Sequence, residues 1–504
     1  MEVREESKEL LTYRDTFDWR LFLAGFTLTT SHSGRRARVA VATLDERVVD
    51  SLVPRVPLFA SDLPRGPASE ILQPIAGHRR LFPRAQAEWN STLVAILNED
   101  RKTVVRLLLR EGEALPTNGQ GKIPLLPRLQ FLPLKGYRSE ERKVTSFLRK
   151  TFDLKRDHRT ELAVVYDAVG QTPGDYSSSF HLALGPEIPA AKATKRIHYT
   201  LLHSMLANRE GVTRNWDTEF LHDFRVAVRR TRSALTQLKS VLPQAEVDHF
   251  SGEFRWLGAR TGPTRDLDVY LLKIPAYREA LHQGAREDLE PLVRLLQEKK
   301  RVEHRKLRRC LGSKRFNRLM EDWRAFLETP DVPGSDLLNA RRPIREVASE
   351  RIWKAFNKVL RRGGEIGRKT AAEALHRLRI DCKKLRYLIT FFRSLYPAKA
   401  LNPLIKELKR LQDHLGDYND LQVQREALGR FAEEMMATTV GPPATMLAMG
   451  QLMGQLEGKQ IQEREAFHQH FGQFSCAKNQ ERFRDLFGPD PGADPKPPQG
   501  EESS

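Results

Sequence analysis

Two segments of this chain, 154 positions apart, repeat one helical pattern in register and without gaps. Residues 221–243 read LHDFRVAVRRTRSALTQLKSVLP, and residues 375–397 read LHRLRIDCKKLRYLITFFRSLYP. The basic positions that recur are His222 with His376, Arg225 with Arg379, Arg229 with Lys383, Arg230 with Lys384, and Arg232 with Arg386. Repetition at a fixed offset indicates that this part of the chain folds as two copies of one supersecondary unit.

In each segment an apolar stripe runs along one helix face and a basic row lies beside it. The apolar residues step by three, four or seven positions, which is the spacing of a packed helix face. They are Leu221, Phe224, Val228, Leu235, Leu238 and Leu242, then Leu375, Leu378, Cys382, Leu385, Ile389, Phe392 and Tyr396. At about 100° per residue, the basic row lies roughly 110° from the centre of the stripe. Two packed units would therefore bring both rows into one partly desolvated groove. The alternative is that each basic row is an ordinary solvent-exposed helix face. The repetition of the row in register disfavours this alternative.

Composition narrows the class of partner. The 504 residues suffice for two or three domains, and 84 Lys and Arg against 65 Asp and Glu give a formal net charge of +19. Such an excess of positive charge favours a polyanionic binding partner, which could be nucleic acid, an anionic membrane surface or a phosphate polymer. No apolar run has the length of a membrane span, and the charged start lacks the apolar core of a signal peptide. Three widely spaced cysteines suit a reducing cytosol, so we expect a cytoplasmic protein.

The chain order predicts an α+β domain followed by an all-α domain of two pseudo-symmetric four-helix bundles. We expect an α+β domain at 1–168, a linker at 169–191, helices over 192–475 and a disordered tail at 488–504. The first helical repeat would span about 192–330 and the second about 340–475. Strands are expected at 39–43, 103–111 and 128–137, a proline-rich loop at 51–70 and a helix at 140–154. Helix breaks are expected at Gly211, at Pro243, near Gly262 and Pro263, at Pro330–Pro333, and at Gly363 and Gly364.

The repeat continues beyond the basic segments, at 254–269 and 408–423. There Gly262 matches Gly416, and Asp266 matches Asp420. A glycine followed by an aspartate favours a helix end in a left-handed cap and a new helix start at the aspartate. The second interpretation is that each aspartate orients a neighbouring arginine.

The basic rows are suited to binding phosphate. Arginine presents a planar fork to two phosphate oxygens, lysine is a mobile point charge, and histidine adds a donor. Further basic residues that would extend this phosphate-binding surface are Arg255, Arg260, Arg265, Lys409, Arg410 and His414. No nucleophile with a base and no carboxylate pair accompanies the rows, so we expect no catalytic residue and no cofactor there. Metal binding by His222 or His376 is not expected, because the neighbouring arginines repel a cation.

At roughly 190–475 the chain resembles the CHAD domain, the conserved-histidine α-helical domain. LHDFRVAVRRTRSAL and LHRLRIDCKKLRYL, each followed by a Gly…Asp-Leu segment, resemble its two histidine helices. The resemblance implies two four-helix bundles about a pseudo-twofold axis, with a basic inner surface that binds inorganic polyphosphate. It would place the ten repeated basic residues named above in the polyphosphate site.

The N-terminal region resembles the CYTH, or triphosphate tunnel, fold. YRDTFDWRLFLAGFTL at 13–28 is similar to the family's Tyr-Asp-Thr-Pro-Asp…Leu…Gly…Leu segment, and LPLKGYRSE at 132–140 to its Lys-Gly-Tyr strand. The start MEVREESK does not match the Glu-x-Glu-x-Lys strand of active members, and Thr29 and Thr30 replace a cationic strand. A metal-dependent triphosphatase needs those carboxylates for Mg²⁺, so we expect a degenerate, inactive domain.

Three functions remain open from the sequence. The first is non-catalytic binding of inorganic polyphosphate, with association to polyphosphate granules. The second is an inorganic triphosphatase that acts through residues 1–150 with Mg²⁺. The third is a helical nucleic-acid binder, which the scarcity of aromatics in the basic rows disfavours. A membrane-surface role is weaker, because the repeat uses the apolar faces for packing.

Overall fold

The computed structural model describes residues 1–43, 48–116, 121–132, 134–330, 337–367, 370–438 and 441–489. The chain divides into two compact units, Met1–Ser178 and Ser179–Ser504. This division falls inside the predicted linker at 169–191. Apart from its first two residues, the tail predicted at 488–504 lies outside the described residues.

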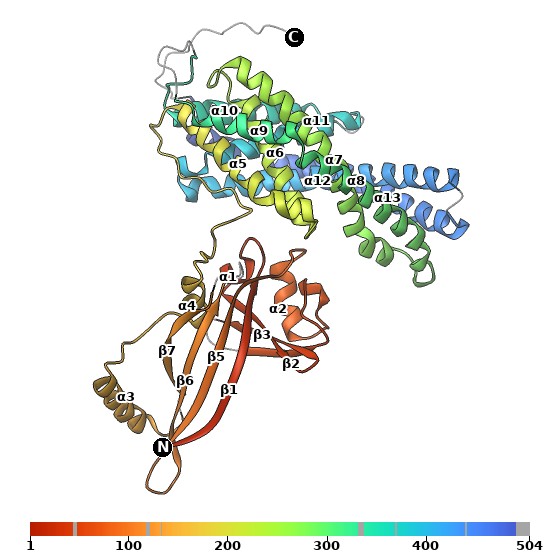
Figure 1. The fold of residues 1–504 in the computed structure, drawn as a ribbon. Helices are drawn as coiled ribbons and strands as arrows, with labels where there is room; N and C mark the ends of the chain where they lie inside the picture. Colours follow the sequence, from red (N-terminus) through yellow and green to blue (C-terminus); the bar gives the residue numbers. More distant parts are fainter. Residues whose placement is uncertain are drawn as a thin grey trace. The chain divides into compact units, whose positions relative to one another are not determined.

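The first unit is a seven-stranded antiparallel sheet in the order β4-β3-β2-β1-β5-β6-β7 (Figure 1). Its strands are β1 (Glu2–Asp15), β2 (Phe26–Ser33), β3 (Arg36–Thr43), β4 (Val48–Val53), β5 (Phe82–Leu97), β6 (Thr103–Leu115) and β7 (Ile123–Leu132). Its helices are α1 (Arg20–Leu23), α2 (Pro67–Ala76), α3 (Arg138–Phe152) and α4 (Glu161–Ala168), with a 3₁₀ turn at Ala60–Asp62. This antiparallel domain fits the CYTH-like expectation.

Different helices cover the two faces of this sheet. Leu28 pairs with Arg14 of β1, whereas Tyr13 pairs with Thr29, so Leu28 and Tyr13 point to opposite faces. The Leu28 face packs against α2 at one end and α3 at the other. On the opposite face, Tyr13 and Trp89 pack against α4. The sheet is therefore buried on both faces over part of its area.

The segment that resembles the CYTH motif forms a buried turn after β1. Asp15 accepts hydrogen bonds from the backbone N–H groups of Thr16, Leu21 and Phe22 at 2.6, 3.0 and 2.8 Å. Asp18 is buried and pairs with Arg20 and Arg79, whose Nε atoms lie 3.0 and 3.4 Å from its carboxylate. The two carboxylates therefore accept hydrogen bonds from backbone N–H groups of the turn and pair with the arginines beside it.

Two sequence predictions in this unit need correction. The expected Lys-Gly-Tyr strand is wrong, because β7 ends at Leu132 and Lys135–Tyr137 lie in the turn before α3, where Gly136 has a φ of 97°. The expected loop at 51–70 ends early, since α2 begins at Pro67 with proline in its first turn.

From Ala190 onward, the described part of the second unit consists of helices joined by short connections (Figure 1). Its first repeat contains α5 (Ala190–Arg214), α6 (Thr218–Gln237), α7 (Gln244–Ala280), α8 (Glu290–Leu311) and α9 (Lys314–Glu328). Its second repeat contains α10 (Ile344–Gly364), α11 (Ala372–Phe391), α12 (Ala398–Ala437), α13 (Pro443–Phe474) and α14 (Ala477–Phe487). Short 3₁₀ turns lie at Gln283–Ala285, Glu287–Leu289 and Arg393–Leu395. The predicted α+β domain followed by an all-α domain is confirmed.

The helix starts follow the repeat found in the sequence. α5 and α10, α6 and α11, and α7 and α12 each begin 154 residues apart. Pro189 and Pro343, equivalent at that offset, face each other in an antiparallel bridge. The Ala190 N–H donates to Arg342 O, and the Ile344 N–H donates to Ile188 O, both at 2.9 Å. An antiparallel bridge between equivalent residues has local twofold symmetry, as expected for two repeats related by a pseudo-twofold axis.

Some predicted helix breaks are wrong. Pro243 precedes α7 and Gly364 ends α10, as expected. Gly211, however, lies inside α5, where an added Cβ would collide with the Phe220 ring. Gly262 and Pro263 lie inside α7, which continues to Ala280. The break expected at Pro330–Pro333 follows the end of α9, and 331–333 lie outside the described residues.

The helices of both repeats share a core. α7, α8, α12 and α13 bury a common cluster that includes Leu267, Leu292, Leu428 and Met449. Beyond the predicted end of the domain at residue 475, α14 packs back onto α10, where Phe483 stacks on Phe356 with ring centroids 3.8 Å apart. Among the described residues, no helix is long and apolar enough to cross a membrane.

The two halves of the predicted linker belong to different units. In the first unit, Asp175 accepts a hydrogen bond from Trp19 Nε1 at 2.6 Å. In the second unit, the Phe180 ring packs edge-on against Phe391, and the Leu184 N–H donates to Ser394 Oγ at 3.1 Å. Residues 179–189 thus form an ordered strap on the helical unit.

Candidate functional site

The repeated basic segments form α6 and α11, which pack against each other. Asp217 caps α6, since its Oδ1 accepts from the backbone N–H groups of Glu219 and Phe220 at 2.8 and 3.1 Å. The apolar stripes predicted from the sequence are buried on both helices, including Phe224 at 0% and Leu385 at 0% exposure. Burial of the stripes fixes where the neighbouring basic rows point.

Packing of α6 on α11 brings cations of the two repeats together. Burial, followed by the charges of Arg379 and Arg229, lowers the pKa of Lys383 to about 8. Burial also lowers the pKa of Arg230, and the charge of Arg386 acts in the same direction. Arg229 and Lys383 are equivalent positions, so the pseudo-twofold axis passes near them.

We call the following residues the basic cluster: Arg225, Arg229, Arg230, Arg232, Arg379, Lys383 and Arg386. Lys384 adjoins Lys383 in the chain and is half-buried, but no contact among the described residues links it to the cluster.

Arg225 lies against the backbone of α7. Its Nη1 donates to Gly258 O at 3.0 Å and to Thr261 Oγ1 at 2.8 Å. An added Cβ at Gly262 would lie 3.5 Å from the same Nη1. Burial and the charge of Arg229 lower the pKa of Arg225 to about 10, whereas Asp266 acts in the opposite direction. An alanine methyl at 262 would therefore touch this guanidinium at ordinary van der Waals distance, whereas a longer side chain would compete with it for space.

The prediction that the glycine–aspartate pairs mark helix ends is wrong. α12 runs through Gly416 and Asp420 just as α7 runs through Gly262 and Asp266. Instead, Asp420 Oδ1 accepts from Arg379 Nη2 at 3.4 Å. The second interpretation, an aspartate that orients an arginine, describes Asp420, and the charge of Asp266 acts on Arg225 in the equivalent way.

The last arginine of each row, Arg232 or Arg386, is held differently in the two repeats. Arg386 Nη1 donates to Gln412 Oε1 at 3.1 Å. At the equivalent position α7 has Gly258, where an added Cβ would lie 3.4 Å from Arg232 Nη1. Burial and the charge of Arg255 lower the pKa of Arg232.

The two histidines make different hydrogen bonds. His222 Nδ1 lies 3.0 Å from Arg265 Nη2, and because a guanidinium can only donate, Nδ1 accepts and carries no proton. His376 Nδ1 lies 2.8 Å from Asn419 Oδ1, to which it donates in the assigned amide orientation. Asn419 is the repeat equivalent of Arg265. The two repeats therefore give Nδ1 of the histidine different partners, a guanidinium donor at His222 and an amide oxygen acceptor at His376.

The secondary basic residues divide into three groups. Arg255, Arg260, Lys409 and Arg410 are exposed, with Arg410 paired to Glu407 of its own helix. Arg265 ties α7 to the start of α6, since it also donates to Thr218 O at 2.9 Å. His414 is buried, so it does not join the cluster. Its Nδ1 lies 2.8 Å from Glu463 of α13, and its ring stacks on His470.

Three nearby residues were missed by the sequence analysis. Gln412 is buried and links Arg386 to the Cys382 carbonyl. Lys273 of α7 lies close enough to α12 that the charges of Asp420 and Asp417 act on it, although burial lowers its pKa overall. The Phe180 ring centroid lies 5.8 Å from the Arg230 guanidinium. None of the three belongs to the repeated basic pattern of the sequence.

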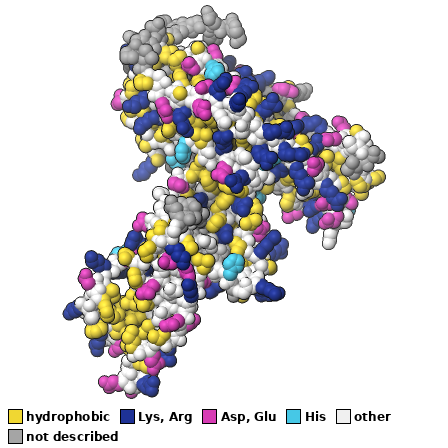
Figure 2. Space-filling model, viewed as in Figure 1, with side chains coloured by type: hydrophobic (Ala, Val, Ile, Leu, Met, Phe, Trp, Pro, Cys, Tyr) yellow, Lys and Arg dark blue, Asp and Glu magenta, His cyan; other side chains and the backbone are white. Residues whose placement is uncertain are grey.

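The basic cluster has few acidic partners. Within the described part of the chain, Arg229, Arg230, Arg232, Lys383 and Arg386 make no ion pair with a carboxylate. Figure 2 shows Lys and Arg side chains gathered on the visible face of the helical unit. No group of three or more His, Cys, Asp or Glu side chains among the described residues could hold a metal ion. The arrangement is suited to binding a polyanion.

Comparisons with known proteins find curated relatives and solved structures that are similar to part of this chain. Two uncharacterized proteins of Mycobacterium tuberculosis, from strains CDC 1551 and H37Rv, are each 28% identical over 291 residues, which is 56% of this chain and 52% of theirs. The chain thus spans about half the length of the curated relatives it matches. The crystal structure of the CHAD domain from the plant Ricinus communis is 26% identical with a TM-score of 0.48, over 58% of this chain and 96% of that one. PptA from Streptomyces chartreusis is 18% identical with a TM-score of 0.43, over 56% and 99%.

The family match is specific to the helices described above. The CHAD domain family matches residues 196–429, a range that contains α6, α7 and α11 entirely and most of α12. Every member of the basic cluster lies inside this range. The helical unit of this chain therefore carries a CHAD domain, at residues 196–429.

Proposed function

We propose that this protein binds inorganic polyphosphate at the basic cluster between α6 and α11 and does not act on it chemically. The observation that carries the proposal is the approach of Arg229 to Lys383 across the two repeats, where neither makes an ion pair with a carboxylate among the described residues. Burial, and then repulsion from the neighbouring cations Arg379 and Arg229, lowers the pKa of Lys383. A polyanion bound among them would remove that repulsion.

The spacing of the cluster is suited to a chain of phosphates. Arg225, Arg229 and Arg232 follow one helix face, so successive guanidinium groups start about 5 to 6 Å apart along α6. Each guanidinium can hold two phosphate oxygens at once. A flexible polymer with one charge or more on every unit can match such a row. The basic inner surface and the polyphosphate ligand implied by the CHAD resemblance support the same class of ligand.

Nucleic acid is a less suitable ligand for this surface. Sequence-independent binding of single strands uses aromatic platforms on which bases stack. At the cluster, Phe180 is already beneath Arg230 and packed against Phe391, and Tyr387 stacks on Phe391. The aromatic rings beside the cluster thus have protein partners. We further propose a cytosolic setting, in which the protein associates with polyphosphate granules.

The proposal is tested by titrating the purified full chain at near-physiological salt with three ligands: long-chain polyphosphate, single-stranded DNA of equal total charge, and orthophosphate. The proposal expects tight binding of polyphosphate that weakens steeply with salt, because each neutralised phosphate releases counterions. Orthophosphate should compete poorly. Equal competition by DNA would contradict a phosphate-polymer site, and release of phosphate from the polymer would contradict a non-catalytic role.

A further inference from the structure

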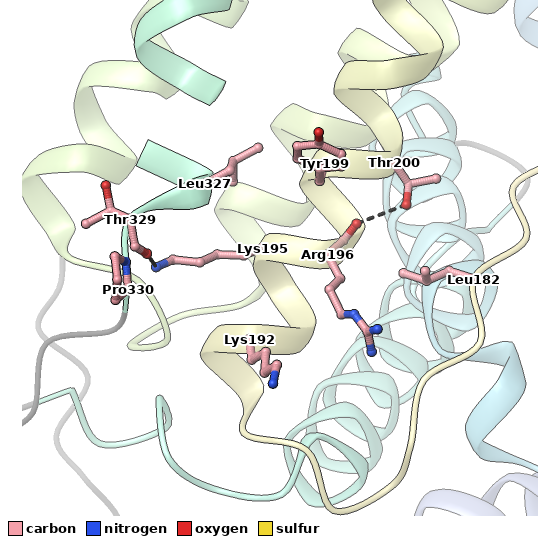
Figure 3. Close-up of a pocket in the computed structure, with 9 residues that line it drawn as sticks. All are labelled: Leu182, Lys192, Lys195, Arg196, Tyr199, Thr200, Leu327, Thr329 and Pro330. Atoms are coloured by element: carbon pink, nitrogen blue, oxygen red, sulfur yellow. Dashed lines mark hydrogen bonds between the residues drawn. The ribbon is translucent and has the colours of Figure 1, made fainter. Parts of the chain in front are cut away.

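A second basic surface lies on α5, outside the basic cluster. The side chains of Lys192, Lys195 and Arg196 line a pocket of about 530 Å³ beside the first two turns of the helix (Figure 3). The other lining residues are Leu182, Tyr199, Thr200, Leu327, Thr329 and Pro330. They come from the strap at 179–189, from α5 and from the end of α9, so the pocket is built entirely within the helical unit.

Two of the three cations in this pocket are available to a ligand. Lys195 Nζ donates to Thr329 O at 2.7 Å, toward one side of the pocket (Figure 3). Lys192 and Arg196 are exposed, and their side chains point away from Thr329. Among the described residues, neither the Lys192 ammonium nor the Arg196 guanidinium has a hydrogen bond or an ion pair. Both can therefore bind an anion without giving up a hydrogen bond or an ion pair within the described residues.

The pocket adjoins the basic cluster through the strap. Phe180 lies beneath the Arg230 guanidinium, at 5.8 Å, and Leu182 lines the α5 pocket. Two residues of extended chain span at most about 7 Å. One short stretch of the strap thus has the cluster at one end and the pocket at the other.

The pseudo-symmetric position in the second repeat has the opposite charge. At the offset of 154 residues, Lys192 corresponds to Glu346 and Arg196 to Glu350. On α10 these two carboxylates accept hydrogen bonds from Arg342, at 3.2 and 2.5 Å. The start of α5 therefore presents two cations, whereas the equivalent place on α10 presents two carboxylates that are already paired with Arg342.

We infer that the α5 pocket is an accessory phosphate subsite, which receives a polyphosphate chain where it leaves the basic cluster on the first-repeat side. This inference rests on the proposed function. Within the cluster, pseudo-symmetry makes the two directions along a phosphate chain nearly equivalent. The difference between α5 and α10 removes that equivalence for a long polymer, because Lys192 and Arg196 offer cations to it whereas Glu346 and Glu350 offer none. A ligand too short to leave the cluster does not sense the difference.

The test compares two charge-reversal variants of the full chain. Lys192→Glu/Arg196→Glu installs on α5 the residues found on α10. Lys314→Glu/Arg318→Glu is the matched control, with two exposed cations at the same spacing on α9 and the same change in net charge. Each is titrated with tripolyphosphate and with long-chain polyphosphate over a range of salt concentrations, with helicity checked by circular dichroism.

The pocket variant should bind the long polymer about tenfold more weakly, with a salt slope shallower by about 1.5, as expected for two lost phosphate contacts. Its affinity for tripolyphosphate should match that of the unmodified chain. Long-polymer binding no weaker in the pocket variant than in the control would overturn the subsite, and so would an equal loss for both ligands. Failure of the proposed function looks different, because the unmodified chain would then show no polymer-selective binding at all.

Discussion

Arg229 of α6 and Lys383 of α11 occupy equivalent positions in two repeats and lie close enough that the charge of one lowers the pKa of the other. A single helix with a basic flank cannot create this arrangement. It arises because α6 and α11 contact each other while each buries its apolar stripe within its own repeat, where α6 packs on α5 and α7 and α11 packs on α10 and α12. The resulting repulsion is a cost of folding that a bound polyanion would remove.

Polyphosphate binding should decline as pH rises through about 8. Burial and neighbouring cations lower the pKa of Lys383 to about 8, so its ammonium is charged at pH 7 and neutral well above pH 8. A bound polyanion favours the charged form, so binding near pH 8 should take up about half a proton. Calorimetry in buffers of different ionisation enthalpy measures this uptake. Lys383→Arg should bind polyphosphate well and show no proton uptake, whereas Lys314→Arg should behave as the unmodified chain. Proton uptake that persists in Lys383→Arg would contradict its assignment to Lys383.

Asp420 should weaken polyphosphate binding. Its carboxylate pairs with Arg379, and its charge also acts on Lys383 and Lys273. Since Asp420 is half exposed, with 55% of its side chain accessible, removing the charge should raise affinity only modestly, up to about fivefold. Asp420→Asn is compared with Asp413→Asn, an exposed aspartate on the same helix. A loss of affinity in Asp420→Asn would show that the pair with Arg379 instead positions this arginine for the ligand.

Glycine 262 should be required for the position of Arg225. A larger side chain at Gly262 would displace the guanidinium that donates to Gly258 O and Thr261 Oγ1. Gly262→Leu should therefore weaken polyphosphate binding, by about tenfold if one bidentate contact is lost. Gly416→Leu is the matched control, because an added Cβ there meets no atom within 4 Å. That change should leave binding intact and stabilise the protein by about 0.8 kcal/mol, as expected for glycine in a helix interior. Equal binding by the two variants would contradict the role given to Gly262.

The first repeat should lose stability in acid because of His198. This side chain is fully buried on α5 against Trp323, and burial lowers its pKa to about 3. The unfolded chain binds a proton below its ordinary pKa of about 6.5, whereas the folded chain does not, so stability falls as pH drops below about 6.5. The loss approaches about 1.4 kcal/mol per pH unit for one such group.

The equivalent residue of the second repeat is Ile352, also fully buried. His198→Ile should flatten the stability profile between pH 6 and pH 4, measured by chemical denaturation. His203→Ile, an exposed position on the same helix, should not. A profile that stays equally steep in His198→Ile would assign the acid sensitivity to other groups.

The sequence was most informative about packing. Every residue of the two apolar stripes is buried, because the stripes follow the helical period, although Leu238, Leu242, Phe392 and Tyr396 lie beyond the ends of α6 and α11. Of the ten repeated basic residues, the cluster contains seven and leaves out His222, His376 and Lys384. The glycine–aspartate pairs were misread, because Gly262 has two possible roles. A small residue can end a helix or can admit a side chain from a neighbouring helix, and only the position of Arg225 against α7 decides between them.

Contacts between elements distant in the chain could not be predicted. His414 resembles the other basic residues of its segment, but α13 buries it against Glu463 and His470. Phe180 was assigned to a linker, and its contact with Arg230 depends on how the strap lies across the helices. In the sheet unit, β1 is mostly charged and exposed toward its start, so it lacks the alternation that marks a half-buried strand.

The most direct test of the central claim is titration of Arg229→Ala/Lys383→Ala with long-chain polyphosphate at near-physiological salt. Lys314→Ala/Arg318→Ala serves as a control with the same loss of charge. We expect the first pair of substitutions to weaken binding at least tenfold, because each lost charge-assisted contact contributes about 1.5 kcal/mol or more. The control pair should lose little affinity, and circular dichroism should show that both variants remain folded. Equal binding by the two double variants would contradict the account, because the polymer would then respond to net charge and not to the residues that the two repeats bring together.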